Sequence, residues 1–501
     1  MNLRIIVIHY LLICELTSLS AFLPIHPHKD HIEDKMRRYS GIIITLKKEV
    51  QVNTKIVIIG SGSQFTEFFL QELFKFEEFK GITLDLVDRR PKRLEQELRL
   101  AKALNEAVDW EVEITGHTDR KQALEGASFV YCFIAVNQKE AWKKEFELAN
   151  KNGVYPCEAY TAGAPGLGMA IRHVPVVLDI CADIEKICPD AWLILDNNPL
   201  AKLLAAVFKH TKTKCIGYCN GHELMQMALE QLLELDERDA SERAADPVQR
   251  EFMVPAGNIN ITLAGINHLQ WLLDIRDTKT GKDLYPEVRK RIQDPALVPE
   301  GYKFSAEVCR LFGYFPSPAD NHVADYIWCV EKDIYKDLSL APYPVDQWFG
   351  GRDADAWGKI ADSIKNKEDA EKYVNQRRVG WMNLTIARYM LSGTQKYFPA
   401  LNMLNNGAIS NLDDDIVVEV PSVVGPDGFK ASAVGPLPDQ IAPICALHGR
   451  ITNIAADAAA TGSKELALKA LLLDPYVHNL KRAQAYLEDI LAYCKKYDTS
   501  F

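Results

Sequence analysis

From Lys55 onward, short apolar runs alternate with stretches whose apolar residues recur at helical spacing. A continuous apolar run is typical of a strand buried on both faces, and helical spacing is typical of a helix packed on such a sheet. The predicted strands are Lys55–Ile59, Ile82–Val87, Val112–Ile114, Phe129–Val136 and Ala191–Leu195. Helices are predicted over Phe65–Phe76, Pro91–Val108 and residues 169–188. This alternation predicts a parallel sheet with right-handed crossovers.

The second half of the chain has a different pattern. Residues 235–250 are highly charged, which predicts a solvent-exposed segment before a strand at Ile259–Leu263. Beyond residue 270, long helical patterns dominate, and one strand is predicted among them. The helices are predicted at Glu368–Leu391, Leu437–Thr461 and Pro475–Lys496, and the strand at Val417–Val424. We therefore expect an α/β protein with a Rossmann-like domain over residues 54–265 and an α+β domain over residues 266–501.

Composition narrows the class of protein. Of 501 residues, 48% are hydrophobic and 25% are charged, which is ordinary globular composition and excludes a disordered chain. With 58 basic and 68 acidic side chains the net charge is −10, which argues against nucleic acid or an anionic membrane as a partner. Eleven irregularly spaced cysteines do not form a disulfide framework and suit a reducing compartment. We expect a cytoplasmic protein.

A glycine-rich turn, Gly60-Ser61-Gly62-Ser63, directly follows the first predicted strand and precedes a predicted helix. Such a turn lets the backbone approach a pyrophosphate, and the helix start offers free N–H groups and a positive dipole end. Gly60, Gly62 and Ser63 are therefore candidate cofactor-binding residues. The third glycine of the dinucleotide fingerprint is replaced by Phe65, so a plain strand–helix turn stays open as an alternative.

Asp88 stands 28 residues after Gly60, at the end of the second predicted strand. A carboxylate there accepts both ribose hydroxyls of NAD and repels the 2′-phosphate of NADP. Arg89 and Arg90 follow it directly and could instead meet a phosphate. We predict NAD as the cofactor.

Residues 1–53 precede the first predicted strand. Ile5–Cys14 is apolar except for His9, and Ser18-Leu19-Ser20 offers a small-x-small cleavage pattern, as in a secretory signal. The run is too short to span a membrane. We favour a leader outside the fold, or an extension from a mis-assigned start with translation beginning at Val52, because the remainder has the features of a cytosolic nucleotide enzyme.

Three polar clusters follow predicted strands: Asn197-Asn198-Pro199, Gly217–His222 and Ala264–His268. In open α/β sheets ligands bind where strands end, so these clusters are candidates for one site. A thiolate from Cys219 and an imidazole from His268 could hold a divalent cation and leave positions open for substrate oxygens. Each residue also has an ordinary alternative, because Cys219 could be a buried small hydrophobe and His268 a satisfied core histidine.

Nearly the whole chain after residue 53 resembles family 4 of the glycoside hydrolases, from residue 54 to about residue 496. The resemblance rests on Lys55–Ser63, Ala127–Val136, Asn198-Pro199, Gly217–Cys219, Ala264–His268, Asn405–Ile409 and Val418–Pro421. It implies a nucleotide half similar to lactate and malate dehydrogenases, with a second domain of their C-terminal type. It also implies glycoside cleavage by a redox route that uses NAD and a divalent metal, usually manganese, outside the common two-carboxylate mechanism.

The resemblance assigns roles to individual residues. It implies that Cys219 and His268 are metal ligands, and that Asn198 contacts a substrate hydroxyl. Tyr314, 46 residues after His268, stands where the family places its catalytic base. Asn220 stands where some members carry an acid, so it occupies the catalytic position after the cysteine and leaves the leaving-group proton donor unassigned.

Phosphate-specific members carry arginines at two places where this chain has none. There is no arginine between Ile134 and Trp142, and Asn321-His322 stands in the later segment. Because bidentate phosphate capture favours arginine, we expect an unphosphorylated hexoside or uronide as the substrate.

The implied chemistry explains the residue types. NAD takes hydride from carbon 3 of the sugar, and the resulting ketone acidifies the proton on carbon 2. A metal on the oxygens of carbons 2 and 3 stabilises the enolate, and a tyrosine beside that metal removes the proton. The aglycone then leaves by elimination, water adds, and NADH returns its hydride. The net reaction is hydrolysis.

Two other functions stay open: a NAD-dependent dehydrogenase of a hydroxy acid or sugar, and a catalytically silent NAD or sugar sensor. His222 is a candidate second ligand or a support for the ligands. Arg172 and His173 lie near the cofactor or on a helix surface. The terminal helices are core and oligomer surface, and we expect a homodimer or homotetramer.

Overall fold

The computed structural model describes residues 54–155, 161–235, 255–329, 355–375, 383–477, 479–497 and 499–501. The first six strands form a parallel sheet in the order β3-β2-β1-β4-β5-β6. They are β1 (Lys55–Ile59), β2 (Thr83–Val87), β3 (Glu113–His117), β4 (Phe129–Cys132), β5 (Trp192–Leu195) and β6 (Lys214–Gly217). This order is that of a Rossmann sheet, and the predicted fold class is confirmed.

The sheet continues through strands from the second half of the chain. β10 (Lys396–Leu404) lies antiparallel between β6 and β11 (Val417–Gly425), and β7, β8 and β9 follow. These last are β7 (Ile259–Ile266), β8 (Leu269–Asp277) and β9 (Pro316–Ser317), while β12 (Gly428–Ala431) pairs with β11. A division at residue 265 would therefore cut through β7. Within Asn53–Phe501, both expected domains share one twelve-stranded sheet and one compact unit.

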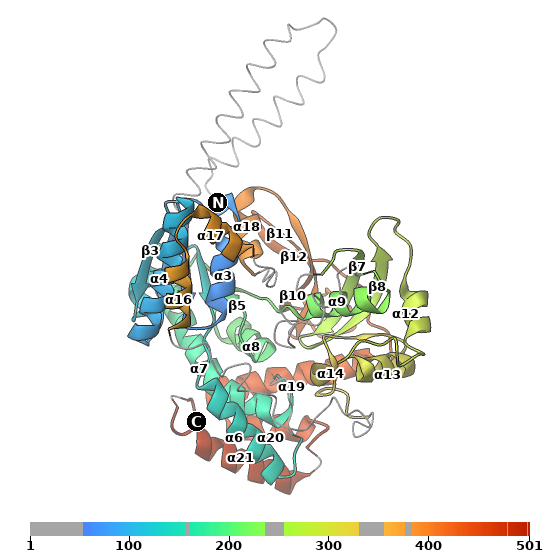
Figure 1. The fold of residues 1–501 in the computed structure, drawn as a ribbon. Helices are drawn as coiled ribbons and strands as arrows, with labels where there is room; N and C mark the ends of the chain where they lie inside the picture. Colours follow the sequence, from blue (N-terminus) through green and yellow to red (C-terminus); the bar gives the residue numbers. More distant parts are fainter. Residues whose placement is uncertain are drawn as a thin grey trace, which may run out of the picture. The chain divides into compact units, whose positions relative to one another are not determined.

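Helices cover the parallel part of the sheet on both faces (Figure 1). Ile56 and Ile58 of β1 face a cluster with α3 (Phe65–Leu73), α4 (Pro91–Val108), α16 (Ala356–Ser363), α17 (Lys367–Val374) and α18 (Asn383–Ser392). Val57 and Ile59 face a cluster with α7 (Gly163–Ile187), α8 (Leu200–His210) and α19 (Ala442–Thr461). Alternate residues of a strand point to opposite faces, which is why this apolar run needs cover on both sides. Late helices thus complete the layers of the early sheet.

The helix α16 spans Ala356–Ser363, α17 spans Lys367–Val374 and α18 spans Asn383–Ser392. The last two replace the single helix predicted at Glu368–Leu391, and residues 376–382 between them lie outside the described residues. The predicted helix at Leu437–Thr461 begins only at Ala442. The remaining helices are α5 (Arg120–Leu124), α6 (Gln138–Lys151), α9 (Gly221–Leu232), α12 (Tyr285–Arg291), α13 (Lys303–Phe312), α14 (Asp320–Val323), α20 (Lys464–Leu473) and α21 (Leu480–Cys494).

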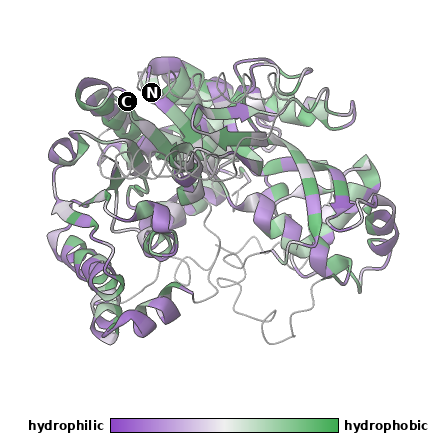
Figure 2. Ribbon diagram, turned by 90° about the horizontal axis from the view of Figure 1, so that it is seen from above, coloured by the Kyte–Doolittle hydropathy of each residue, from purple (hydrophilic) through white to green (hydrophobic). Residues whose placement is uncertain are grey.

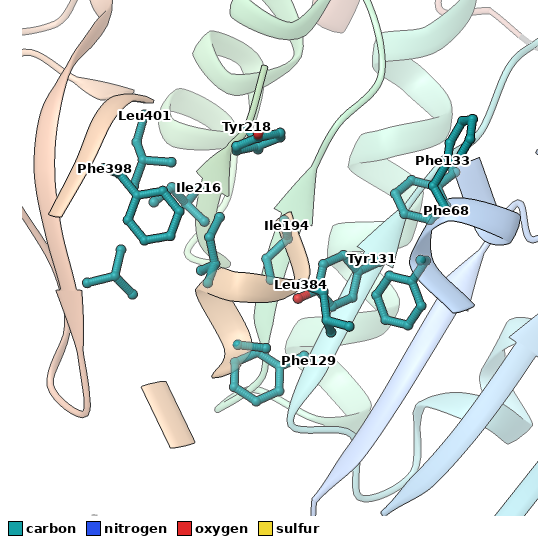
Figure 3. Close-up of a cluster of buried hydrophobic side chains, with 14 of the residues drawn as sticks. Phe68, Phe129, Tyr131, Phe133, Ile194, Ile216, Tyr218, Leu384, Phe398 and Leu401 are labelled. Atoms are coloured by element: carbon teal, nitrogen blue, oxygen red, sulfur yellow. The ribbon is translucent and has the colours of Figure 1, made fainter. Parts of the chain in front are cut away.

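The core joins the two halves of the chain. Figure 3 shows aromatic and aliphatic side chains of β4, β5 and β6 packed with Leu384 of α18 and with Phe398 and Leu401 of β10. The Tyr131 hydroxyl donates a hydrogen bond to the Asn383 carbonyl at 3.1 Å, which ties β4 to α18. Apolar residues concentrate on the central strands and polar ones on the outer helices (Figure 2). This packing fixes the strand ends that carry the candidate site.

Two predictions fall outside the described residues: the leader at residues 1–53 and most of the charged stretch at 235–250. The strand predicted at Phe129–Val136 ends at Cys132, because the chain then leaves the sheet to pass Gly60. Among the described helices, none combines the length and the apolar character that crossing a membrane requires.

Candidate active site

The glycine-rich turn lies where the order of the parallel strands reverses, between β1 and β4. Gly60 has a φ of +83°, a left-handed conformation that glycine adopts without strain. A Cβ at Gly60 would lie 2.8 Å from the backbone nitrogen of Ile134, so the two segments approach closer than a side chain allows. Ser63 is half-buried, and its Oγ accepts a hydrogen bond from the Phe65 N–H at 3.3 Å as α3 begins. Open α/β sheets bind ligands at such a point.

Asp88 directly follows β2 and lies beside the glycine-rich turn. Its Oδ2 accepts a hydrogen bond from the Gly62 N–H at 2.7 Å, and its Oδ1 accepts one from the Arg90 N–H at 2.9 Å. The Arg90 guanidinium also binds both carboxylate oxygens, from Nε and Nη2, each at 2.9 Å. Burial raises the pKa of Asp88, but the bonds from Arg90 and Gly62 outweigh it and hold the pKa below its ordinary value. Asp88 is therefore ionised.

Cys219 follows β6, and Asn267 and His268 form the tight turn between β7 and β8. Burial and the nearby Glu419 carboxyl raise the pKa of the Cys219 thiol well above its ordinary value, while hydrogen bonding from Gly221 and Asn267 lowers it. The Asn267 side chain thus lies beside the Cys219 sulfur, and His268 is the next residue. The structure brings these two parts of the chain together across β10 and β11, where Gly217, Asn402, Glu419 and Gly265 pair in one row of the sheet.

His268 is held in a defined orientation. It has a φ of +65°, and its side chain is 3% exposed. The Thr161 Oγ1 lies 3.1 Å from its Nδ1 and 3.0 Å from the Tyr326 hydroxyl, which donates to the Asn267 carbonyl at 3.2 Å. The His322 ring packs edge-on against it, 4.4 Å between ring centres. Burial, His322 and Lys202 all lower the pKa of His268, so the imidazole is neutral, as a metal ligand must be.

Buried polar side chains of β10, β11 and β8 adjoin this turn. Asn402 pairs across the sheet with Gly217 on one side and Glu419 on the other. The Asn267 Nδ2 donates to Glu419 Oε2 at 3.0 Å, and burial raises the pKa of Glu419 to about 7. The amides of Gln270 and Asn402 also lower this pKa, although among the described residues only Asn267 makes a well-formed hydrogen bond to the carboxyl. Glu419 therefore anchors the side chain that touches Cys219.

Three further candidate residues lie at the same ends of β5 and β6. Asn198 is half-buried between β5 and α8. Asn220 is half-buried at the N-cap of α9. His222 is 1% exposed, and its Nδ1 lies 3.1 Å from the Cys219 carbonyl. Burial lowers the pKa of His222 to about 4, so its ring is neutral and braces the loop that presents the thiol.

Tyr314 lies between α13 and β9, and its half-buried ring packs edge-on against Tyr285 at 6.4 Å. The hydrogen bonds of the described residues join Tyr326, and not Tyr314, to His268 through Thr161. Tyr326 carries no local sequence signal, because its partner Thr161 is 165 residues away.

Arg172 and His173 are both fully buried on α7, so their placement on a helix surface was wrong. Arg172 forms a bidentate pair with Glu145, with Nη2 to Oε1 at 2.9 Å. The His173 Nε2 accepts the Val136 N–H at 3.0 Å, and burial lowers its pKa to about 3. Both residues hold the segment that follows β4, beside the glycine-rich turn.

Among the described residues, no group of three or more histidine, cysteine, aspartate and glutamate side chains is assembled for a metal ion. The donor set that fits a cation is Cys219 and His268, a thiol that a bound ion would deprotonate and a neutral imidazole. Two protein ligands leave coordination positions for the oxygens of a substrate or water. The buried Asn267 Oδ1, which has no hydrogen-bond partner among the described residues, also lies at this point.

Comparisons with known proteins show which family this chain matches. The family model "Family 4 glycosyl hydrolase" matches residues 55–235, and the model of that family's C-terminal domain matches residues 263–477. The chain is 29% identical to the α-galactosidase of Bacillus subtilis, with 88% of this chain and 96% of the relative covered. It is 27% identical to the α-glucosidase of Erwinia rhapontici, with 87% and 97% covered.

A solved structure shows the same fold. It is a 6-phospho-α-glucosidase from gut microorganisms in complex with NAD and Mn²⁺. The TM-score is 0.70 at 21% sequence identity, and 88% of this chain and 98% of that chain are covered.

Proposed function

Because this chain belongs to the family 4 glycosyl hydrolases, we propose that it hydrolyses the O-glycosidic bond of an unphosphorylated hexoside or uronide by NAD- and Mn²⁺-dependent elimination and addition. The observation that carries the proposal is the position of the Cys219 thiol beside the side chain of Asn267, the residue before His268. Cys219 follows β6, whose carboxyl end lies at the same edge of the parallel strands as the glycine-rich turn and Asp88.

The nucleotide end fits a dinucleotide. The close approach at Gly60 leaves no room for a side chain, and the start of α3 follows directly. We assign Gly60, Gly62 and Ser63 to the pyrophosphate and the ionised Asp88 to a ribose.

The other end fits a divalent metal and a sugar. Cys219 and His268 would hold the ion, His222 and Thr161 would orient its ligands, and Asn198 would bind a substrate hydroxyl. When bound, the nicotinamide supplies reversible hydride transfer and the metal supplies Lewis acidity. The lack of an arginine between Ile134 and Trp142 supports a substrate without a phosphate.

This chain must supply a base for the proton on carbon 2 of the oxidised sugar. We assign that role to Tyr314, and Tyr326 is the alternative because it is linked to His268 through Thr161. Asn220 carries no acidic proton at neutral pH, so we propose that it orients the leaving group rather than protonates it.

The test is a panel of chromogenic glycosides, with and without a 6-phosphate, incubated with NAD, Mn²⁺ and a reductant in deuterated water. We expect turnover of an unphosphorylated glycoside and deuterium at carbon 2 of the released sugar. Hydrolysis without deuterium, or activity that survives metal removal, would contradict the redox route. Net accumulation of NADH would identify a dehydrogenase, and binding without turnover would identify a sensor.

We further propose that the protein is cytoplasmic and forms a homodimer or homotetramer. The cysteines among the described residues, including those buried on β4 and β6, are free thiols, which a reducing compartment preserves. Leu472, Leu473 and Leu480 are exposed around the turn from α20 to α21 and offer an apolar face for a second copy. Light scattering of the purified chain measures the oligomeric state.

A further inference from the structure

The Arg90 side chain covers the carboxylate of Asp88, which we have assigned to the cofactor ribose. Its guanidinium binds Asp88 through Nε and Nη2, and its backbone N–H binds the same carboxylate. The fourth bond to Asp88 comes from the Gly62 N–H. Both oxygens of Asp88 are therefore already engaged, and ribose hydroxyls of a dinucleotide must compete with Arg90 for them.

The guanidinium also lies against the glycine-rich turn. A Cβ at Gly62 would collide with Arg90 Nη2 and with Asp88 Oδ2. The absence of a side chain at Gly62 thus makes room for Arg90, in addition to any room it makes for a ligand. The Arg90 side chain is 60% exposed, so solvent reaches the guanidinium that covers Asp88.

The surroundings of this pair are positively charged. Arg93, one turn along α4, lies with its guanidinium carbon 4.7 Å from the Trp357 ring centre. Its buried Nε has no hydrogen-bond partner among the described residues. Glu97 is 1% exposed, accepts the Ser61 hydroxyl at 2.6 Å, and has a pKa that burial raises to about 8. At neutral pH the two arginines therefore face one ionised carboxylate, Asp88, and one protonated carboxyl, Glu97.

We propose that Arg90 makes the cofactor site tolerant of a 2′-phosphate, so that the protein binds NADP as well as NAD. Asp88 alone would repel the phosphate, and Arg90 cancels that charge where the phosphate would lie. A guanidinium has five N–H donors, and the Nη1 donors of Arg90 are not used by Asp88. Arg93 supplies a second positive charge beside them. For NAD, Arg90 is instead a competitor that the ribose must displace. This inference rests on the proposed function, because it assumes that the dinucleotide binds here.

The test measures dissociation constants of the full chain for NAD and NADP by titration calorimetry, without substrate turnover. The variants are Arg90→Ala, Arg90→Lys and the matched control Arg89→Ala, whose exposed side chain adjoins the pair. We expect the wild-type constants for the two dinucleotides to lie within about tenfold of each other. Arg90→Ala should raise the ratio of the NADP to the NAD constant by about tenfold or more, because Asp88 is then uncompensated.

Arg90→Lys should give an intermediate ratio, because it keeps the charge but loses the bidentate geometry. Arg89→Ala should leave the ratio unchanged. Tight NAD binding with no NADP binding by the wild type would overturn the inference, as would an unchanged ratio in Arg90→Ala that unfolds at the wild-type temperature. Failure of the folded wild type to bind either dinucleotide would overturn the proposed function itself, and the inference with it.

Discussion

Asn267 connects the two predicted metal ligands. Its amide reaches the Cys219 thiol and donates to Glu419, its carbonyl accepts the Tyr326 hydroxyl, and the next residue is His268. A single side chain therefore couples the loop after β6 to the turn after β7. The sequence marks Cys219 and His268 as unusual, but the hydrogen bonds of Asn267 depend on β11 and are invisible in any local pattern.

Tyrosine variants separate the two candidate bases. Tyr314→Phe should lower turnover by about a hundredfold or more and leave Mn²⁺ affinity unchanged, because loss of a general base affects proton removal. Tyr326→Phe should weaken Mn²⁺ binding first, because its hydroxyl supports Thr161 and the Asn267 carbonyl. Steady-state rates and Mn²⁺ titrations of both variants provide the comparison. If Tyr314→Phe turned over substrate at the wild-type rate, the catalytic base would be another residue.

The buried carboxyl of Glu97 should make the free energy of unfolding depend on pH. Its pKa is raised from 4.5 unfolded to about 8 in the folded chain, because it is buried. The folded state then holds a proton that the unfolded state has lost, so the stabilisation present at low pH declines as the pH rises towards 8. Each unit of pKa difference corresponds to about 1.4 kcal/mol. Between pH 6.5 and 8.5, Glu97→Gln should lose less thermal stability than the wild type.

The control for this experiment is Glu95→Gln, an exposed residue on the same helix. Its unfolding temperature should follow that of the wild type across the pH range. If the unfolding temperatures of the wild type and Glu97→Gln changed with pH in parallel, Glu97 would be ionised in the folded chain.

At the scale of elements, α19 packs closely enough on the segment before β11 to require a glycine. A Cβ at Gly449 would lie 2.6 Å from Cγ2 of the fully buried Ile416. Gly449→Ala should therefore destabilise the chain by about 1–3 kcal/mol and lower its unfolding temperature. In Gly358→Ala on α16, the new Cβ meets only the ends of Gln96 and Arg99, which can move away. Gly358→Ala should unfold at or above the wild-type temperature. If Gly358→Ala and Gly449→Ala lowered the unfolding temperature equally, the packing argument would be refuted.

A helix or strand could be predicted from the sequence where its pattern lies in consecutive residues. Strand β5 is a complete apolar run, β1 is one after Lys55, and β2 alternates polar and apolar residues. The positions of all three follow from the sequence within a residue or two. Strand β10 was not predicted, because Lys396–Leu404 includes Pro399 and begins with exposed residues. Its place between β6 and β11 depends on pairing across about 180 residues of chain, which no local period encodes.

At the scale of the whole molecule, one continuous sheet runs through the described parts of both expected domains. The nucleotide end lies on β1 and β2, and the proposed metal ligands follow β6 and β7, on either side of the inserted β10 and β11. The insertion brings Glu419 and Asn402 between the loops that carry Cys219 and His268. The proposed metal site therefore depends on the assembly of the whole sheet.

Absorption spectroscopy of the full chain loaded with Co²⁺ in place of Mn²⁺ tests most directly whether Cys219 and His268 hold one ion. A thiolate ligand gives an intense sulfur-to-cobalt charge-transfer band in the near ultraviolet. We predict this band in the wild type and in Cys215→Ala, whose thiol is buried on β6, and its loss in Cys219→Ala. His268→Gln should weaken Co²⁺ binding. A band that persists in Cys219→Ala, or Co²⁺ affinity unchanged by both the Cys219 and His268 substitutions, would contradict the account.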